Sequence, residues 1–359
     1  MRKKLIYFIN VPWGWIKQRP QFLAEELANF YDITVVNIDL FWKRQKSTVK
    51  GLKILNIYRL PFEKIKFISW ISKKIVSFQL NYYSRREYNI VWLTSPSLMP
   101  VAAKFFRRRF VVYDCMDDML EFPNNIKQQH AIMEREKQLY SLADIVFTSA
   151  EYLKSKLYKR YGDKKIVVVN NAVTSNILKP SSSINYQLSS LFDKNFFNIS
   201  YIGTISEWFD FDLIEEVIRE YNNVVFHLFG PSVVPIPTNN HICHHGSIPH
   251  SDVFSAMFYS DALIMPFIVT ELIKSVNPVK LYEYIAAGKP CLAPEYGESV
   301  PFKDFVYLYK NRQNCLEHIA VLLHEQRVKS EGERIKFLED NTWACRARII
   351  AEEIDNNYK

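Results

Sequence analysis

The chain has 359 residues, of which 48% are hydrophobic and 23% are charged, and its net charge at pH 7 is +8. This composition excludes an intrinsically disordered chain, and the length suits two α/β domains of roughly 150 residues each. The five cysteines are odd in number and form no CxxC pair, so they predict neither a disulfide framework nor a zinc site. No apolar stretch approaches the ~20 residues that a membrane-spanning helix needs.

The net charge is divided unevenly along the chain. Residues 1–175 hold 30 Lys and Arg against 15 Asp and Glu, a net charge of +15, whereas the remaining residues hold 16 against 23, a net charge of −7. Two halves of opposite sign predict two domains with different partners, and the basic half is expected to meet an anionic partner. No nucleic-acid-binding motif accompanies this charge, which argues against DNA or RNA.

Short apolar runs separated by amphipathic segments recur through the first half. The runs are rich in Val, Ile, Phe and Tyr, which is typical of parallel strands that are covered on both faces. The predicted strands are Lys4–Ile9, Ile33–Ile38, Leu52–Ile57, Ile90–Thr94, Phe110–Tyr113, Ile145–Thr148 and Ile166–Val169. Amphipathic segments such as Arg19–Asn29 and Gln128–Ala143 lie between them, so we expect a doubly wound α/β domain over residues 1–174.

The loop after the first strand combines residue types that suit a sugar or an anion. Gly14 would let the backbone approach a ligand, and Trp13 offers a flat face for a sugar ring. Arg19 and Pro20 open the following helix, whose N-terminus favours anions. The alternative is a loop that packs its tryptophans inward.

Residues 43–86 carry most of the positive charge of the first domain. They hold 12 Lys and Arg against the single acid Glu63, with Phe67, Trp70 and Phe78 among the cations. A basic helix with Trp and Phe on its surface is typical of a segment that lies in a membrane interface, so we expect this region to meet an anionic membrane surface. The alternative is that the apolar residues face the domain core.

Three carboxylates follow the strand that ends near Tyr113. Asp114, Asp117 and Asp118 would lie at the carboxyl edge of the sheet, where ligands of α/β domains bind. Asp117 or Asp118 is therefore a candidate general base or a ligand of sugar hydroxyls, with capping of the next helix as the alternative.

A second set of strands begins after residue 196. Residues 175–196 have no clear period and are expected to link two domains. The predicted strands of the second domain, residues 197–340, are Ile199–Ile202, Val224–Phe229, Ile242–His245, Leu263–Pro266, Pro290–Ala293 and Val306–Tyr309. Residues 341–359 read as a final helix. Because ligands bind beyond the carboxyl ends of such strands, we expect two Rossmann-like domains to face a central cleft.

The stretch from Asn277 to Pro290 is the strongest motif. Asn277 is predicted to cap a helix whose first residue is Pro278. Lys280 then lies in the first turn, where its charge and the helix dipole both favour an anion, and Glu283 follows one turn later on the same face. A cation for a diphosphate and a carboxylate for a ribose diol describe a nucleotide diphosphate site. A Lys–Glu surface pair is the alternative.

These motifs resemble the family-4-like group of GT-B glycosyltransferases, which includes enzymes of bacterial capsule, teichuronic acid and other surface polysaccharide synthesis. The resemblance runs through nearly the whole chain in the expected order. The stretches that carry it are Trp13 to Ala24, Tyr113 to Asp118, Ala143 to Ser149, Tyr201 to Thr204, Leu228 to Pro231, His245 to Pro249 and Lys280 to Pro290.

The resemblance implies a nucleotide sugar as donor, with no metal ion and no further cofactor. It implies that Gly203 and Thr204 lie at the donor, and that the loop from His245 to Ile248 presents its backbone to the base. It also implies that the last helix crosses back onto the first domain.

The chain departs from the group at two places. The group often carries a further Glu at the position of Ser275, and Arg and Lys after the glycine that corresponds to Gly203, where this chain has no cation. Lys280 and Arg19 would then have to neutralise the phosphates. The departures leave retaining and inverting chemistry both open.

We therefore expect a hexosyltransferase-like enzyme whose donor is a nucleotide diphosphate sugar, in particular a UDP-sugar. The enzyme would move the sugar to a lipid-linked or glycan acceptor. It would work in the cytoplasm as a peripheral membrane protein. A UDP-sugar 2-epimerase of the same fold and a non-catalytic module that binds glycan or lipid are the alternatives.

Overall fold

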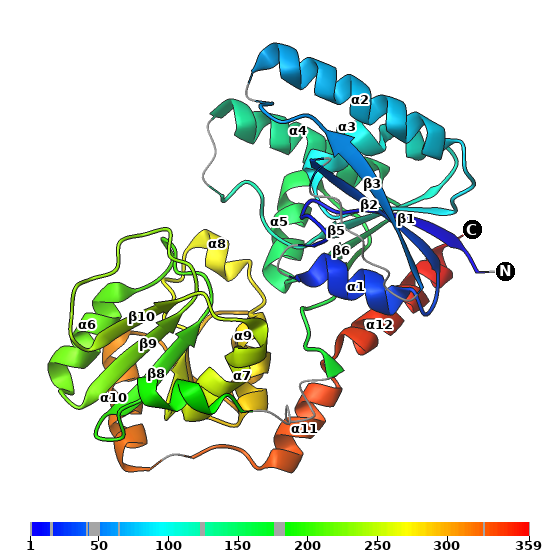
Figure 1. Cartoon of the computed structure of the whole chain (residues 1–359). Helices are drawn as coiled ribbons and strands as arrows, with labels where there is room; N and C mark the ends of the chain where they lie inside the picture. Colours follow the sequence, from blue (N-terminus) through cyan, green and yellow to red (C-terminus); the bar gives the residue numbers. More distant parts are fainter. Residues whose placement is uncertain are drawn as a thin grey trace. The chain divides into compact units, whose positions relative to one another are not determined.

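The chain is divided into two compact units, Met1–Asn171 together with Trp343–Lys359, and Ala172–Thr342 (Figure 1). This is a computed structural model, and it describes residues 2–14, 17–40, 42, 51–63, 65–122, 126–175, 184–325 and 327–358. The final helix thus belongs to the N-terminal unit. The described residues 184–196 of the expected linker belong to the C-terminal unit, where the Asn185 backbone N–H donates to Ser255 Oγ at 2.9 Å and Phe192 is buried.

The N-terminal unit is built on a parallel sheet of seven strands in the order β3-β2-β1-β4-β5-β6-β7. The strands are β1 (Lys4–Phe8), β2 (Asp32–Leu40), β3 (Leu52–Arg59), β4 (Ile90–Leu93), β5 (Phe110–Cys115), β6 (Ile145–Thr148) and β7 (Ile166–Val168). All seven predicted strands are present. The direction of winding reverses between β1 and β4, and the carboxyl ends of these two strands mark the point where such sheets bind ligands.

Aromatic side chains fill both faces of this sheet, which explains why the strands are apolar throughout. Tyr7 of β1 stacks on Trp92 of β4 with ring centroids 5.2 Å apart, and Trp92 stacks in turn on Phe147 of β6 at 5.6 Å. On the other face, Phe8 meets Phe105 edge-to-face at 5.3 Å. All five rings are buried.

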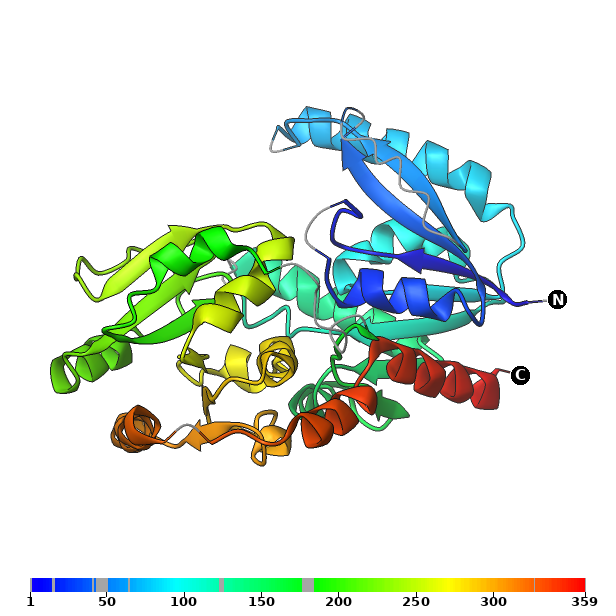
Figure 2. The ribbon, with the colours of Figure 1, turned by 60° about the horizontal axis from the view of Figure 1, so that its bottom comes forward.

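Six α-helices are described in the N-terminal unit. They are α1 (Arg19–Leu27), α2 (Lys66–Ser84), α3 (Met99–Ala102), α4 (Ile126–Leu142), α5 (Glu151–Tyr161) and α12 (Trp343–Asn357). The helix α12, last in the chain, packs along α1, the first (Figure 2). Trp343 is buried and stacks on Phe22 with ring centroids 5.3 Å apart, and the Tyr31 hydroxyl donates to the Ala351 carbonyl at 3.4 Å.

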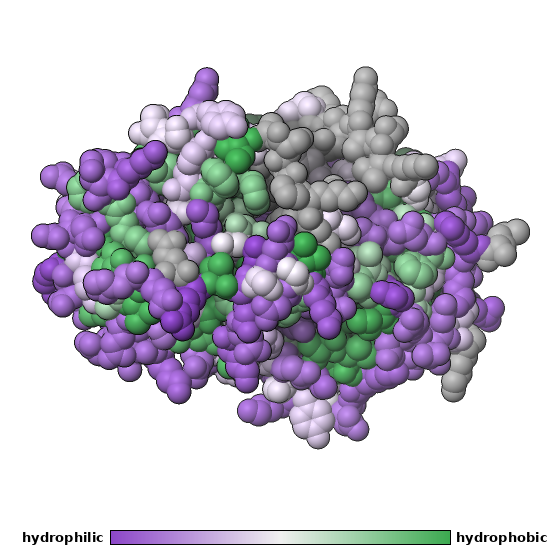
Figure 3. Space-filling view, turned by 90° about the horizontal axis from the view of Figure 1, so that it is seen from below, coloured by the Kyte–Doolittle hydropathy of each residue, from purple (hydrophilic) through white to green (hydrophobic). Residues whose placement is uncertain are grey.

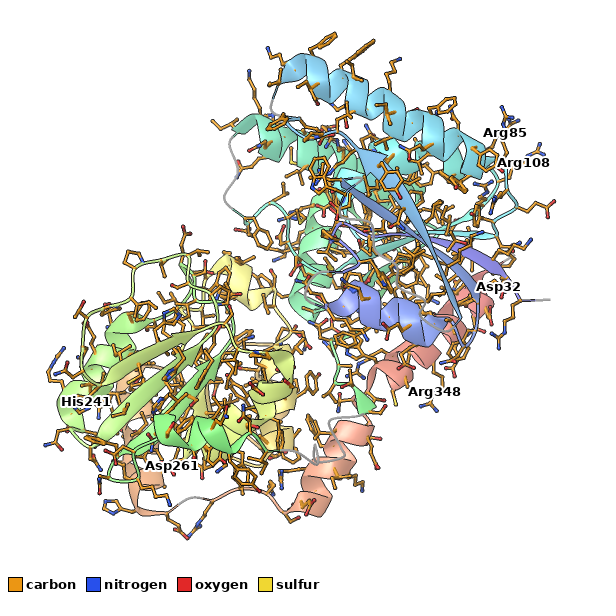
Figure 4. All side chains as sticks on the ribbon, in the orientation of Figure 1. Asp32, Arg85, Arg108, His241, Asp261 and Arg348 are labelled. Atoms are coloured by element: carbon orange, nitrogen blue, oxygen red, sulfur yellow. The ribbon has the colours of Figure 1, made fainter. Side chains whose placement is uncertain are left out.

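The C-terminal unit repeats the same topology with six parallel strands in the order β10-β9-β8-β11-β12-β13. They are β8 (Phe197–Ile202), β9 (Val224–Phe229), β10 (Ile242–Gly246), β11 (Ala262–Ile264), β12 (Cys291–Pro294) and β13 (Tyr307–Tyr309). The winding reverses between β8 and β11. His241 and Asp261, labelled in Figure 4, precede β10 and β11 and mark the amino edge of this sheet. Both predicted Rossmann-like domains are therefore confirmed.

The α-helices described in the C-terminal unit are α6 (Phe211–Glu220), α7 (His250–Tyr259), α8 (Glu271–Lys274), α9 (Val279–Ala287), α10 (Arg312–His324) and α11 (Glu331–Glu339). Gly288 ends α9 in the left-handed conformation, and Arg334 of α11 donates to the last α9 carbonyls, Ile285 at 3.1 Å and Ala286 at 3.3 Å. These contacts fix the axis of α9, whose other end carries Lys280.

Within the described residues, no helix has both the length and the apolar composition needed to cross a membrane. The face drawn in Figure 3 is mostly polar, with smaller apolar areas between the polar side chains.

Candidate functional site

Two glycines bring the backbone together at the carboxyl edge of the C-terminal sheet. Gly203 follows β8 with φ +152°, and Gly230 follows β9 with φ +141°, both in the region that favours glycine. The Gly203 N–H donates to the Phe229 carbonyl at 2.8 Å, and a Cβ on Gly230 would overlap the Gly203 carbonyl. At this edge of the sheet, next to the point where the strand order reverses, Gly203 and Gly230 therefore present bare backbone without side chains.

Lys280 lies across this bare backbone. It is the second residue of α9, and a Cβ on Gly203 would come within 2.5 Å of its Nζ. The Nζ is also 5.8 Å from the centroid of the Tyr201 ring, whose hydroxyl donates to the Thr204 carbonyl at 2.8 Å. Burial lowers the pKa of Lys280, and the nearby Glu283 carboxylate opposes that shift. A half-buried cation in the first turn of a helix is a strong attractor for a phosphate.

The start of α9 differs from the prediction at Asn277. The helix begins at Val279, with Pro278 at the cap position, so the expectation that Asn277 caps the helix is wrong. The Asn277 side chain turns inward instead and donates to Glu298 Oε2 at 3.2 Å, with both residues buried. Lys280 and Glu283 keep their one-turn spacing.

Sequence reasoning missed Glu298. It lies in the loop that follows β12, at the same edge of the sheet as Gly203 and beside the start of α9. A carboxylate just after a buried strand is the signal that could have found it, as it found the aspartates of the first domain. At Ser275, where a second acid was missing, the hydroxyl donates to the Glu271 carbonyl at 3.1 Å.

The loop after β10 is held by its histidines. The His245 ring stacks on Phe229 at 4.6 Å, and its Nε2 is 3.0 Å from His227 Nδ1. Burial and the neighbouring His245 lower the pKa of His227 to about 4, so His227 is neutral at pH 7. Burial also lowers the pKa of His245. The His244 Nε2 is 2.8 Å from the Gly230 carbonyl oxygen, and Ile248 packs against the buried Phe192 cluster. These side chains make their contacts within the unit and hold the loop in place. Contact between the loop backbone and a nucleotide base stays a prediction.

In the N-terminal unit, the loop after β1 uses its residues differently from the expected sugar site. Trp13 is only 7% exposed, and its backbone N–H donates to Asn37 Oδ1 at 3.0 Å, so this tryptophan packs inward. Gly14 is exposed. Trp15, the other tryptophan of this loop, lies outside the described residues.

Arg19 is buried in an ion pair that joins the first helix to the centre of the sheet. Its Nη2 is 2.9 Å from Asp114 Oδ1, and its Nη1 donates to the Val169 carbonyl at 2.7 Å. Asp114 is completely buried. The guanidinium charge is thus already compensated within the N-terminal unit, and its contact with a diphosphate stays a prediction.

The two candidate bases, Asp117 and Asp118, have opposite environments. Asp118 is 1% exposed and lies 2.7 Å from Arg160 Nη2 and 3.0 Å from Lys156 Nζ. Burial alone would raise the pKa of Asp118, but hydrogen bonds and charge from Arg160 and Lys156 lower it. Arg160 also contacts the buried Glu136 at 3.4 Å, so Asp118 belongs to an ion-pair network that ties α5 to α4.

Asp117 is partly buried in the same loop, just beyond the end of β5. Burial raises the pKa of Asp117 to about 6, with Asp114 and Asp118 adding to the shift and Arg19 opposing it. A carboxylate that titrates near neutrality can both take up and release a proton under working conditions. The two environments therefore differ: Asp118 is held in an ion-pair network, whereas the raised pKa of Asp117 keeps this residue a candidate for proton transfer.

Among the described residues, no three His, Cys, Asp or Glu side chains cluster as ligands of a metal ion. Metal-independent chemistry and the absence of a further cofactor stay predictions, with Lys280 supplying the positive charge.

No protein-family model matches this chain. By sequence it is similar to TuaH of Bacillus subtilis, which is named as a candidate teichuronic acid biosynthesis glycosyltransferase. The two are 25% identical over 255 residues, which are 64% of this chain and 62% of that protein. The match thus covers about three fifths of each chain.

By structure the chain is similar to several solved proteins over nearly its whole length. Sucrose-phosphate synthase from Thermosynechococcus elongatus superposes with a TM-score of 0.75 at 11% identity, covering 99% of both chains. The Anabaena protein HepE in complex with UDP gives 0.70 at 15% identity, covering 99% of this chain and 100% of that one. An Escherichia coli trehalose-6-phosphate protein bound with UDP-2-fluoro glucose gives 0.71 at 10% identity, covering 98% and 99%. These likenesses confirm the GT-B fold and the resemblance to glycosyltransferases.

Proposed function

We propose that this protein is a glycosyltransferase that uses a nucleotide diphosphate sugar, and specifically a UDP-sugar. The observation that carries the proposal is Lys280, a half-buried cation in the first turn of α9 that lies directly over the bare backbone of Gly203. This position is the carboxyl edge of the sheet beside its topological reversal, where α/β domains bind nucleotides.

The donor would be held by its diphosphate and its ribose. Lys280 and the N-terminus of α9 attract the diphosphate, and Gly203 lets it approach the backbone. Glu283, one helical turn after Lys280, would accept hydrogen bonds from the ribose hydroxyls. Uridine as the base is supported by the neighbours bound to UDP, UDP-glucose and UDP-2-fluoro glucose.

The transfer step assigns one role to each unit. An acceptor hydroxyl oxygen attacks the anomeric carbon, the bond from that carbon to the UDP oxygen breaks, and the electron pair leaves with UDP. Lys280 stabilises the charge that develops on the departing diphosphate. The acceptor proton passes to the Asp117 carboxylate, and an aspartate base of this kind suits inversion at the anomeric carbon.

The acceptor that we propose is a lipid-linked or glycan intermediate of cell-surface polysaccharide synthesis, such as a capsule or a teichuronic acid. The support is the likeness to TuaH. We place the reaction in the cytoplasm, a compartment that suits five free cysteines, of which Cys115, Cys291 and Cys315 are buried.

The donor site is tested by calorimetry with UDP and with uridine. Lys280→Ala should weaken UDP binding by more than about tenfold and leave uridine binding nearly unchanged, because the lost charge faces the diphosphate. Lys289→Ala is the matched control, since Lys289 is also partly buried and lies just beyond the other end of α9. Equal UDP affinity of the Lys280→Ala protein and the wild type would refute the assignment.

The reaction is tested by incubation with the donor that gives the largest rise in thermal stability. Release of UDP that depends on a glycan acceptor supports glycosyl transfer. Conversion of the donor sugar to its epimer without an acceptor would indicate the 2-epimerase instead. Binding of nucleotide sugars without any turnover would indicate a binding module.

A further inference from the structure

The long helix α2 turns an apolar face outward. Ser72, Val76 and Leu80 are its buried residues, and they fix which side faces the unit. The opposite side carries four large rings with exposed fractions of 69% for Phe67, 58% for Trp70, 79% for Phe78 and 67% for Tyr82. The spacing of three, eight and four residues keeps these rings on one face of the helix. We call these four residues the aromatic stripe, and Figure 1 shows its helix at the outer edge of the N-terminal unit.

Exposed cations flank the aromatic stripe along the helix. Lys66, Lys73, Lys74 and Arg85 are all exposed, and Lys74 Nζ lies 5.7 Å from the centroid of the Trp70 ring. Between residues 51 and 86 the single acid is Glu63, which pairs with Arg59 at 3.4 Å. The apolar face is therefore bordered by more positive charge than Glu63 can offset.

A second chain segment adds cations to the end of α2. The Arg109 side chain donates to the Ser84 carbonyl at 3.0 Å and to the Arg86 carbonyl at 3.1 Å. These bonds hold the exposed Arg107 and Arg108 next to Arg85, and Figure 4 labels Arg85 and Arg108 at this end of the helix. The sequence window 43–86 did not include these arginines, and its residues 43–50 and 64 lie outside the described part of the chain.

We propose that α2 is a membrane-docking helix whose aromatic stripe enters the interface of an anionic lipid bilayer. Rings of Trp and Tyr suit the level of the lipid headgroups, where one edge is apolar and the other is wet. The flanking Lys and Arg side chains extend toward lipid phosphates. At about 1.5 Å per residue, the stripe from Phe67 to Tyr82 extends over roughly 23 Å of membrane.

The charge favours a lipid surface over a second copy of this chain. Two copies that met through their α2 helices would bring like charges together along the whole contact, and the positive charges would repel one another. An anionic lipid surface would instead attract the same Lys and Arg side chains. The proposal does not rest on the proposed glycosyl transfer, because docking is measured without donor or acceptor.

The test is co-sedimentation of the full chain with vesicles of phosphatidylcholine, with and without phosphatidylglycerol. Binding should require the anionic lipid and fade as sodium chloride rises. Phe67→Ser with Phe78→Ser should weaken binding by at least about tenfold, and Lys73→Gln with Lys74→Gln by roughly ten- to thirtyfold.

Matched controls use equally exposed residues elsewhere. Tyr186→Ser removes an aromatic ring that is 78% exposed, and Lys303→Gln removes an exposed cation, both in the C-terminal unit. Neither should change vesicle binding. Lipids brominated in the acyl chains should also quench the Trp fluorescence of bound wild type, and Trp70→Phe should remove most of that quenching.

Three outcomes would overturn the proposal. The first is that the wild-type protein does not bind anionic vesicles at low salt. The second is that the Phe67/Phe78 variant and the Tyr186 control bind the vesicles equally well. The third is that the wild-type protein self-associates instead of binding vesicles, and that the Phe67/Phe78 changes abolish this self-association.

Discussion

Asp117→Asn is expected to stabilise the protein while removing its turnover. Burial raises the pKa of Asp117 from 3.8 to about 6, so the ionised carboxylate is less favourable in the folded unit than in the unfolded chain. The shift is roughly two units, and at about 1.36 kcal/mol per unit it costs up to about 3 kcal/mol when the group is charged. A neutral amide of the same shape avoids that cost.

The sign of the effect depends on pH. Because the folded-state pKa is raised, the carboxylate imposes no cost below about pH 4, where it is protonated in both states, and its full cost above about pH 6. Asp117→Asn should therefore raise the free energy of unfolding of the N-terminal unit at pH 8 by up to about 3 kcal/mol, or about 6–12 °C in Tm. The gain should vanish near pH 4.

Asp118→Asn is the matched comparison one residue away. Its carboxylate is buried between Arg160 and Lys156, so its loss takes the closest partner from Arg160 and leaves Lys156 with Glu121 at 2.6 Å. This change should cost about 3 kcal/mol. The pKa of Asp118 is lowered, so this stabilisation is present above about pH 4 and is lost in acid. The two variants should therefore shift the Tm in opposite directions at pH 8.

Scanning calorimetry at pH 8 and pH 4, together with UDP release in the presence of acceptor, checks both variants. Turnover should fall about a hundredfold or more in Asp117→Asn with donor binding intact. The reasoning is refuted if Asp117→Asn is no more stable than wild type at pH 8, or if it keeps full turnover.

Three further predictions concern the same site. Gly203→Ala should abolish UDP binding, because Gly203 has φ +152° and the new Cβ would displace the Lys280 side chain. Gly297→Ala is the control and should bind UDP as wild type does, because its Cβ would meet no neighbouring atom within 4 Å; calorimetry on both variants tests this. The acceptor kcat/KM should fall about tenfold per unit below pH 6 and be flat above it, since the Asp117 base must be ionised; a profile that is flat down to pH 5 would exclude this base. Turnover should survive a chelator of divalent metal ions, because Lys280 supplies the positive charge; loss of turnover that added Mg²⁺ or Mn²⁺ restores would contradict this.

The strands were predictable because each is a short apolar run between polar segments, and all thirteen are where the apolar runs lie. The roles of the three neighbouring aspartates were not predictable, because their partners come from far along the chain. Arg19 reaches Asp114 across 95 residues and Arg160 reaches Asp118 across 42, and no local pattern says which carboxylate is paired. The position of Lys280 was predictable from helix geometry. Asn277 was assigned as a cap because no local pattern shows that its side chain donates to Glu298, 21 residues further along the chain.

The packing of α12 on α1 has a consequence for synthesis on the ribosome. Residues Met1–Asn171 of the N-terminal unit are translated first, but the helix that covers Phe22 is translated only after the whole segment Ala172–Thr342. At about 5–20 residues per second, that segment takes on the order of ten to thirty seconds to make. For that time the nascent chain carries all seven strands of the sheet, while the apolar side of α1 that packs on α12 is uncovered. Chains that terminate before Trp343 would keep this flank open, and they are expected to be the main substrates for chaperones and proteases during expression.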